Sequence, residues 1–220
     1  MKKFLLATAA VCAMSMAAQA ADIAPAPAFA PANWFVHVGG AGVFYSPNFN
    51  NTPVGLPANS QVQLDNNFTG VLEAGRFLNN NFALAISGGF PPTTNVAITS
   101  GGAVVARPGS VTFGSVMLLG QYHFDALGQL RPYVGAGGTY NITFNTQPSA
   151  PFTRFDVANG FGAVLQAGVD LDIKDNVSVF VDVKKVFASA DVTTTAGGFT
   201  AVNNVQFSPV IVSAGVGFRF

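Results

Sequence analysis

Ionisable side chains are rare in this chain of 220 residues, and the histidines and paired aspartates are the first candidates for chemistry. His37, His123, Asp170 and Asp172 could supply acid–base groups or metal ligands. Catalysis would need a nucleophile and its base within about 3 Å, whereas we expect the two histidines on opposite sides of the fold. No third metal ligand follows at a regular spacing. We therefore predict that the protein is not an enzyme and that it holds no metal and no cofactor.

Polar residues recur at alternate positions, so they share one face of their segments. The set comprises His37, Glu73, Gln121, His123, Gln166, Asp170, Asp172, Asp182, Lys184 and Arg219. An isolated buried charge is costly, so these groups must pair or be hydrated if that face points inward. The simpler interpretation is a structural polar plug inside the fold. The sharper one is that the plug blocks straight passage and leaves an apolar cup that accepts hydrophobic solutes.

Eight segments have the two-residue period that indicates β-strands. They are centred on 33–46, 68–77, 82–86, 118–124, 134–144, 161–172, 177–184 and 207–220. One face is almost continuously apolar, and the other carries Gly, Ser, Thr, Gln and the charges. The links at 78–81, 125–129 and 174–176 are short, whereas those at 47–64, 91–110, 145–159 and 188–204 are predicted to be long loops. Short turns at one side and long loops at the other are typical of outer-membrane barrels.

The first residues predict export. Lys2 and Lys3 precede an apolar run, and Ala18-Gln19-Ala20 is a small-x-small site, so residues 1–20 read as a signal peptide cleaved between Ala20 and Ala21. An Ala/Pro-rich periplasmic leader follows at 21–32, and residues 33–220 are expected to form the barrel. The single cysteine lies within the signal peptide, so the mature chain has no disulfide.

Composition points to a membrane rather than to nucleic acid. Charged residues are 9% of the chain, against about 25% in soluble domains, and the mean hydropathy is +0.40. Without the two lysines of the signal peptide, eight basic residues face ten acidic ones, a net charge of −2. No apolar run of about 18 residues follows the signal peptide. A closed, eight-stranded antiparallel β-barrel is the remaining way to place so apolar a chain in a bilayer.

The apolar face is expected to face lipid. Eight strands enclose little more than their own side chains, and Gly135, Gly137, Gly215 and Gly217 suit such an interior. The alternative, a soluble barrel with the apolar face inside, would lack the usual charged surface.

Three stretches, GQLRPYVGAGGTYNITF, FGAVLQAGVDLDIKDNVSVFVDVKKVF and SPVIVSAGVGFRF, resemble the outer membrane protein W (OmpW) family. The resemblance covers nearly the whole mature chain. It implies an eight-stranded barrel of the bacterial outer membrane with an apolar channel for small hydrophobic molecules. The family often has a Pro-Pro pair in its fourth strand, where this chain has Gly114-Ser115-Val116.

The final residues are similar to the signal that the outer-membrane assembly machinery reads. Alternate outward positions are occupied by Val212, Ala214, Val216, Phe218 and Phe220. The expected partners are outer-membrane lipid, the assembly machinery and small hydrophobic solutes, with no nucleic acid. A non-transporting surface or structural role, such as adhesion, envelope integrity or host interaction, is the alternative function.

Overall fold

A computed structural model describes residues 34–51, 53–57 and 59–220. The predicted signal peptide, its cleavage site and the leader lie outside these residues. In the described part no helix is long and apolar enough to cross a membrane. The strands are β1 (Trp34–Phe44), β2 (Asn48–Phe49), β3 (Ser60–Leu64), β4 (Asn67–Phe77), β5 (Phe82–Gly89), β6 (Thr93–Ser100), β7 (Ala103–His123), β8 (Leu130–Pro148), β9 (Phe152–Val157), β10 (Gly160–Lys174), β11 (Val177–Ala196), β12 (Phe199–Phe207) and β13 (Val210–Arg219).

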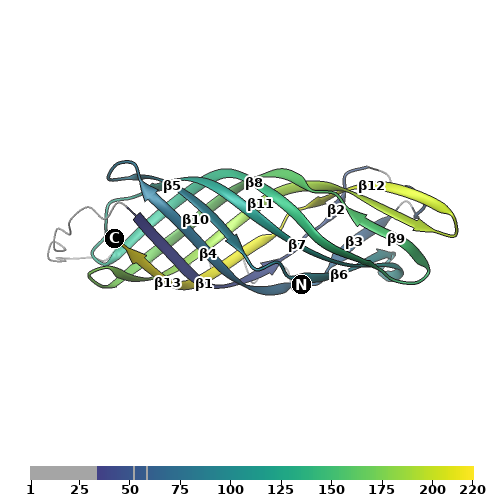
Figure 1. Cartoon of the computed structure of the whole chain (residues 1–220), viewed down its shortest axis with the longest axis horizontal. Helices are drawn as coiled ribbons and strands as arrows, with labels where there is room; N and C mark the ends of the chain where they lie inside the picture. The colour runs from purple at the N-terminus through teal and green to yellow at the C-terminus, as the bar shows by residue number, and fades with distance from the viewer. Residues whose placement is uncertain (1–33, 52, 58) are drawn as a thin grey trace.

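Eight of these strands close into a ring (Figure 1). β1 pairs with β4, the ring continues through β5, β7, β8, β10 and β11, and β13 pairs with both β11 and β1. All of these pairings are antiparallel. The ring leaves no free edge at this level, and it confirms the prediction of an eight-stranded barrel.

The chain keeps its alternation to the last residue because that residue is paired. Trp34 N donates to Phe220 O at 2.9 Å, and Phe220 N donates to Trp34 O at 3.0 Å. These two bonds join the last strand to the first. The five residues of the predicted assembly signal, Val212, Ala214, Val216, Phe218 and Phe220, are all exposed on the outer face.

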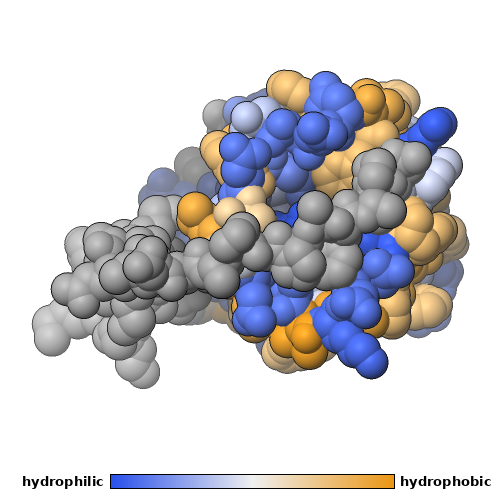
Figure 2. Space-filling model, turned by 90° about the vertical axis from the view of Figure 1, so that its left-hand side faces the viewer, coloured by the Kyte–Doolittle hydropathy of each residue, from blue (hydrophilic) through white to orange (hydrophobic). Residues whose placement is uncertain are grey.

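The two ends of the barrel differ. The end that holds the C-terminus, which we call the short-turn end, carries the turns at 78–81, 124–129 and 175–176 (left in Figure 1). Figure 2 looks onto this end, where hydrophilic residues lie around the centre and hydrophobic residues lie mainly on the flanks. The opposite end, the long-hairpin end, consists of β2, β3, β6, β9, β12 and the far halves of β7, β8 and β11.

The prediction of long loops at that end was largely wrong, because strands extend through much of those segments. The segment 91–110 holds β6 and the start of β7, and 188–204 holds the end of β11 and most of β12. Gly101-Gly102 and Gly197-Gly198 turn these hairpins with positive φ at all four residues. Paired glycines are a strong hairpin signal, because both central residues of a type I′ turn need positive φ. These two Gly-Gly pairs were the sequence signal that could have predicted hairpins in place of loops.

Exposed aromatic residues form two belts on the outer face. One belt lies beside the short turns and the C-terminus and includes Trp34, Phe82, Tyr122, Phe124 and Phe218. The other includes Phe44, Phe68, Phe90, Phe161 and Phe187, roughly ten residues further along the same strands, which is the length of a tilted strand across a bilayer. β7, β8 and β11 have 21, 19 and 20 residues, so they continue well past the second belt.

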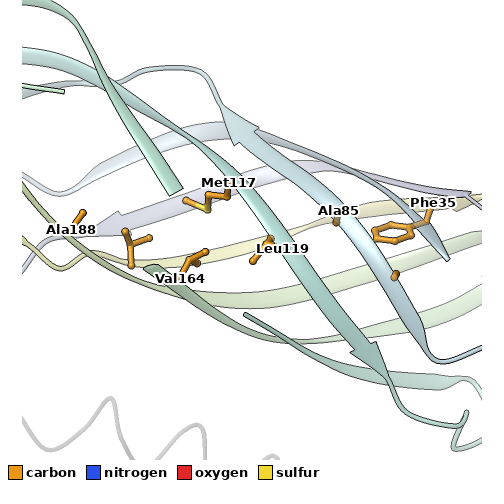
Figure 3. Close-up of a cluster of buried hydrophobic side chains, with 8 residues drawn as sticks. Phe35, Ala85, Met117, Leu119, Val164 and Ala188 are labelled. Carbon is orange, nitrogen blue, oxygen red and sulfur yellow. The ribbon is translucent and has the colours of Figure 1, made fainter. Parts of the chain in front are cut away.

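The interior holds two apolar clusters. The first includes Phe35, Ala85, Met117, Leu119 and Val164, whose side chains lie between the facing walls of the ring (Figure 3). The second lies among the extensions and comprises Val62, Val96, Val111, Phe155 and Val205. The sequence pattern predicts mainly small or polar residues inside the barrel, so these larger inward side chains differ from that expectation.

Candidate functional site

The structure brings all ten predicted lumen residues into one connected group inside the ring, which we call the polar cluster. Eight of them are buried, and Asp172 and Arg219 are partly buried at its edge. The members are His37 on β1, Glu73 on β4, Gln121 and His123 on β7, Gln166, Asp170 and Asp172 on β10, Asp182 and Lys184 on β11, and Arg219 on β13. Strict alternation along each strand is what points them to one interior.

Lys184 is the centre of one half of the cluster. Its Nζ lies 2.5 Å from Asp182 Oδ2 and 3.1 Å from Glu73 Oε2. Gln166 Nε2 donates to Asp182 Oδ2 at 2.5 Å, and Gln121 Nε2 donates to Glu73 Oε1 at 2.8 Å. Two carboxylates therefore share one ammonium, and two amides donate to them, while Asp182 Oδ1 has no hydrogen-bond partner among the described residues.

Asp170 joins this half to the other. Its Oδ1 lies 3.2 Å from His37 Nε2, and its Oδ2 accepts from Arg219 Nη2 at 2.5 Å. Arg219 also donates to Asp172 Oδ1 at 3.2 Å, and Arg131 Nε donates to the other oxygen of Asp172 at 2.5 Å. Together with Arg131, the polar cluster holds four carboxylates against the cations of Lys184, Arg219 and Arg131. His37 lies between Asp170 and Glu73, whose Oε1 is 3.7 Å from His37 Nδ1.

Two members of this group were missed from the sequence. Arg131 bonds Asp172, and the Tyr133 hydroxyl lies 3.5 Å from Asp182 Oδ2. Val134 was expected to point outward, and side chains alternate along a strand, so Arg131 and Tyr133 could have been expected to point inward.

The two histidines are not far apart, contrary to the expectation of opposite sides. Their rings share two aromatic neighbours: Phe35 lies 5.1 Å from His37 and 5.8 Å from His123, and Tyr133 lies 6.2 Å and 5.0 Å from them. The narrow lumen explains this result, because strands that are not neighbours still point their side chains at a common axis. Within the described ranges, no group of three or more His, Cys, Asp or Glu residues could hold a metal ion.

Glycines make room for the cluster in this narrow space. A Cβ at Gly168 would lie 2.5 Å from the Tyr133 hydroxyl, and a Cβ at Gly217 would lie 2.4 Å from Ser178 Oγ. Larger residues at these positions would displace the polar side chains. Of the four inward glycines expected from the sequence, Gly135 and Gly217 adjoin polar side chains, whereas a Cβ at Gly137 or Gly215 would instead meet a backbone oxygen of the neighbouring strand.

A large apolar cavity lies at the long-hairpin end. Its volume is about 400 Å³, and phenylalanines and aliphatic side chains from β2, β3, β6, β7, β9, β11 and β12 line it. Thr194 and Asn203 are its polar lining side chains. Asn203 Oδ1 accepts from Val54 N at 2.7 Å, and its Nδ2 donates to Val54 O at 3.4 Å. Because this amide is already bonded, the surface offered to a guest is essentially apolar.

A smaller cavity of about 70 Å³ lies between this large cavity and the polar cluster. Its lining includes Lys184 of the polar cluster, and Phe113, which packs against the second apolar cluster. The barrel interior is therefore ordered along its axis as polar cluster, small cavity and large apolar cavity.

The matched family model is decisive for the identity of this barrel. The OmpW family model matches residues 32–220. The chain belongs to the OmpW family. An uncharacterised outer-membrane protein of Sinorhizobium fredii (strain NBRC 101917 / NGR234), y4mB, is 31% identical over 99% of this chain and 97% of the relative. This OmpW-family protein is therefore an outer-membrane β-barrel.

The chain is also similar to two further proteins over most of its length. The dibenzothiophene metabolism operon protein PahQ of Pseudomonas aeruginosa is 28% identical over 75% of this chain and 77% of its own length. The solid-state NMR structure of outer membrane protein AlkL in DMPC bilayers superposes with a TM-score of 0.69 at 24% identity, covering 92% of this chain and 96% of AlkL. The AlkL likeness shows the fold. In outer-membrane barrels short turns are periplasmic, so the large cavity of this OmpW-family barrel lies at the extracellular end.

Proposed function

We propose that this protein is an outer-membrane channel that takes up small hydrophobic molecules. The large apolar cavity at the extracellular end is the observation that carries the proposal. A hydrophobic guest gains about 25 cal/mol per Å² of apolar surface removed from water, whereas an ion entering the same cavity would lose its hydration without compensation. A cavity of about 400 Å³ lies within the range of small-molecule sites. The name of PahQ, a protein of a dibenzothiophene metabolism operon, supports an apolar guest.

The polar cluster closes the direct route to the periplasm in this proposal. Its charges pair across the lumen, so a hydrophobic molecule would have to separate buried ion pairs in order to pass. The polar cluster thus acts as the floor of the channel, and the solute leaves sideways into the membrane.

The wall is interrupted beside the small cavity, which offers a place for that exit. The β4–β5 pairing ends with the bond from Phe90 N to Gly70 O at 3.1 Å, and pairing resumes with the bond from Asp65 N to Asn95 O at 3.4 Å, which leaves 66–69 and 91–94 without backbone bonds to each other. Pro91 and Pro92 lie between β5 and β6, and proline has no N–H to donate to a ladder. The prolines lie beside Gly114 of β7, where an added Cβ would come within 3.1 Å of Pro91. The chain therefore carries a Pro-Pro pair in the wall, one strand away from the position expected from the family.

Filling the large cavity tests the proposal. Ala201 lines it, and Val202, the next residue on β12, is exposed on the outer face. In cells that depend on this protein for naphthalene uptake, Ala201→Trp should lower the initial uptake rate several-fold. Val202→Trp should leave it unchanged at equal outer-membrane levels.

Equal uptake by Ala201→Trp and the unmodified protein would contradict entry through this cavity. If the unmodified protein also adds no uptake over cells that lack it, the alternative surface or structural role is the better description.

A further inference from the structure

The small cavity has apolar walls and a polar floor. Val43, Val71, Met117 and Ile211 contribute to the walls. Lys184, Ser87 and Ser213 contribute polar side chains, and all three are buried. At about 70 Å³ the cavity is smaller than the roughly 150 Å³ of a cavity that holds benzene, so it fits the polar end of a guest whose apolar body extends out of it.

Strand register places the two serines beside the carboxylates that hold Lys184. Ser213 pairs with Asp182 between β13 and β11, and Ser87 pairs with Glu73 between β5 and β4. The hydroxyls and the ammonium therefore converge from separate strands on one floor.

This floor has hydrogen-bonding capacity left over. Ser213 is 1% exposed, and its Oγ has no hydrogen-bond partner among the described residues. Lys184 Nζ has three N–H donors, and its two ion pairs engage Asp182 and Glu73. Two other hydroxyls of the lining are occupied, since Thr69 donates to Phe90 O and Ser115 donates to Asn141 Oδ1. A buried hydroxyl without a partner is unfavourable, so a guest oxygen or water is expected to complete it.

Charge decides what kind of oxygen fits. The Lys184 ammonium is already matched by two carboxylates at 2.5 Å and 3.1 Å. A third carboxylate, brought in by an anionic guest, would meet uncompensated negative charge in a buried site. An uncharged hydroxyl or carbonyl oxygen can accept from Lys184 and Ser213 without that penalty.

We propose that the small cavity is a binding site for the oxygen-bearing end of a small uncharged amphipathic molecule, such as a phenol, an alcohol or a ketone. This site rests on the proposed function, because a guest would reach it through the proposed channel. It selects among the molecules that the apolar cavity admits, favouring those with one neutral oxygen over plain hydrocarbons and over carboxylates.

Equilibrium binding to the full-length barrel in nanodiscs tests this site with three matched probes: para-cresol, toluene and benzoate, each corrected for partition into empty nanodiscs. The unmodified protein should bind para-cresol about fivefold or more tightly than toluene, the effect of about one neutral hydrogen bond, and benzoate more weakly than para-cresol. Ser213→Ala should remove most of the para-cresol advantage and leave toluene binding unchanged. Ser178→Ala is the matched control, because Ser178 is also buried with an unpartnered hydroxyl but does not line this cavity.

Equal affinity for para-cresol and toluene, or equal losses in the two serine variants, would overturn the proposal and leave a cavity that holds water only. Preferential binding of benzoate would overturn it as well. These outcomes are separable from failure of the proposed function, which would show as no uptake of toluene by the unmodified protein. Para-cresol binding that depends on Ser213 in a protein without uptake would support the site and contradict the transport function.

Discussion

At the scale of single residues, Lys184 is the cation that two buried carboxylates share. Replacing Lys184 by Met keeps an apolar stem of similar length but leaves Glu73 and Asp182 without their ammonium. Removing one partner of a buried pair typically costs about 3–5 kcal/mol. We expect the free energy of unfolding, measured by urea titration of the barrel in lipid vesicles, to fall by about that amount.

Lys185→Met is the control for this change. Lys185 is the next residue, points to the outer face and bonds the Ser208 carbonyl rather than the polar cluster. Its replacement should change the free energy of unfolding by less than about 1 kcal/mol, as for charged residues near the bilayer interface. Equal effects of the two substitutions would mean that the polar cluster contributes little to stability.

The residues of the polar cluster could be placed from the sequence, because polarity at alternate positions is visible even without a structure. Their pairing could not be placed, because it depends on the stagger of strands around the barrel. Inward positions such as Val164 and Met117 were also hidden, since apolar residues on both faces of a strand erase the alternation. Inward apolar residues therefore cannot be predicted from the alternation of polar and apolar positions.

At the scale of elements, β13 closes the barrel through its final residue. We predict that Phe220→Ala, which keeps the backbone bonds to Trp34 but removes the outward ring, lowers the amount of folded protein in the outer membrane severalfold. Phe220→Tyr should preserve it. Fractionation followed by gels of unheated samples measures the folded amount. Normal levels of Phe220→Ala would show that the paired backbone alone suffices for assembly.

The eight strands of the ring were predictable because each has one uniformly apolar face. The hairpin extensions were harder, because above the second aromatic belt the wall has water outside and the large cavity inside. Outer positions such as Thr93, Asn95 and Thr200 are therefore polar, and such residues are also typical of loops. Gly101-Gly102 and Gly197-Gly198 were the clearer signal for these hairpins, because paired glycines indicate a tight turn with positive φ whatever the polarity of the strands beside it.

At the scale of the whole molecule, the closed ladder makes unfolding cooperative. We expect the folded protein to remain a β-barrel in cold detergent and to change its gel mobility only after boiling, with circular dichroism of β-structure before heating. The physical reason is that opening any one strand breaks pairings on both of its sides. The same mobility before and after boiling would argue against a closed ring.

The arrangement of the whole interior, an apolar extracellular cavity above a paired polar floor, is the basis of the functional account. Its central claim is that the barrel passes small hydrophobic molecules and conducts ions poorly. The most direct measurement compares naphthalene entry into proteoliposomes with ion conductance of the same preparation in planar bilayers. The account predicts naphthalene entry above that of protein-free liposomes together with little steady conductance. Large, steady conductance without naphthalene entry would contradict it and identify a general pore.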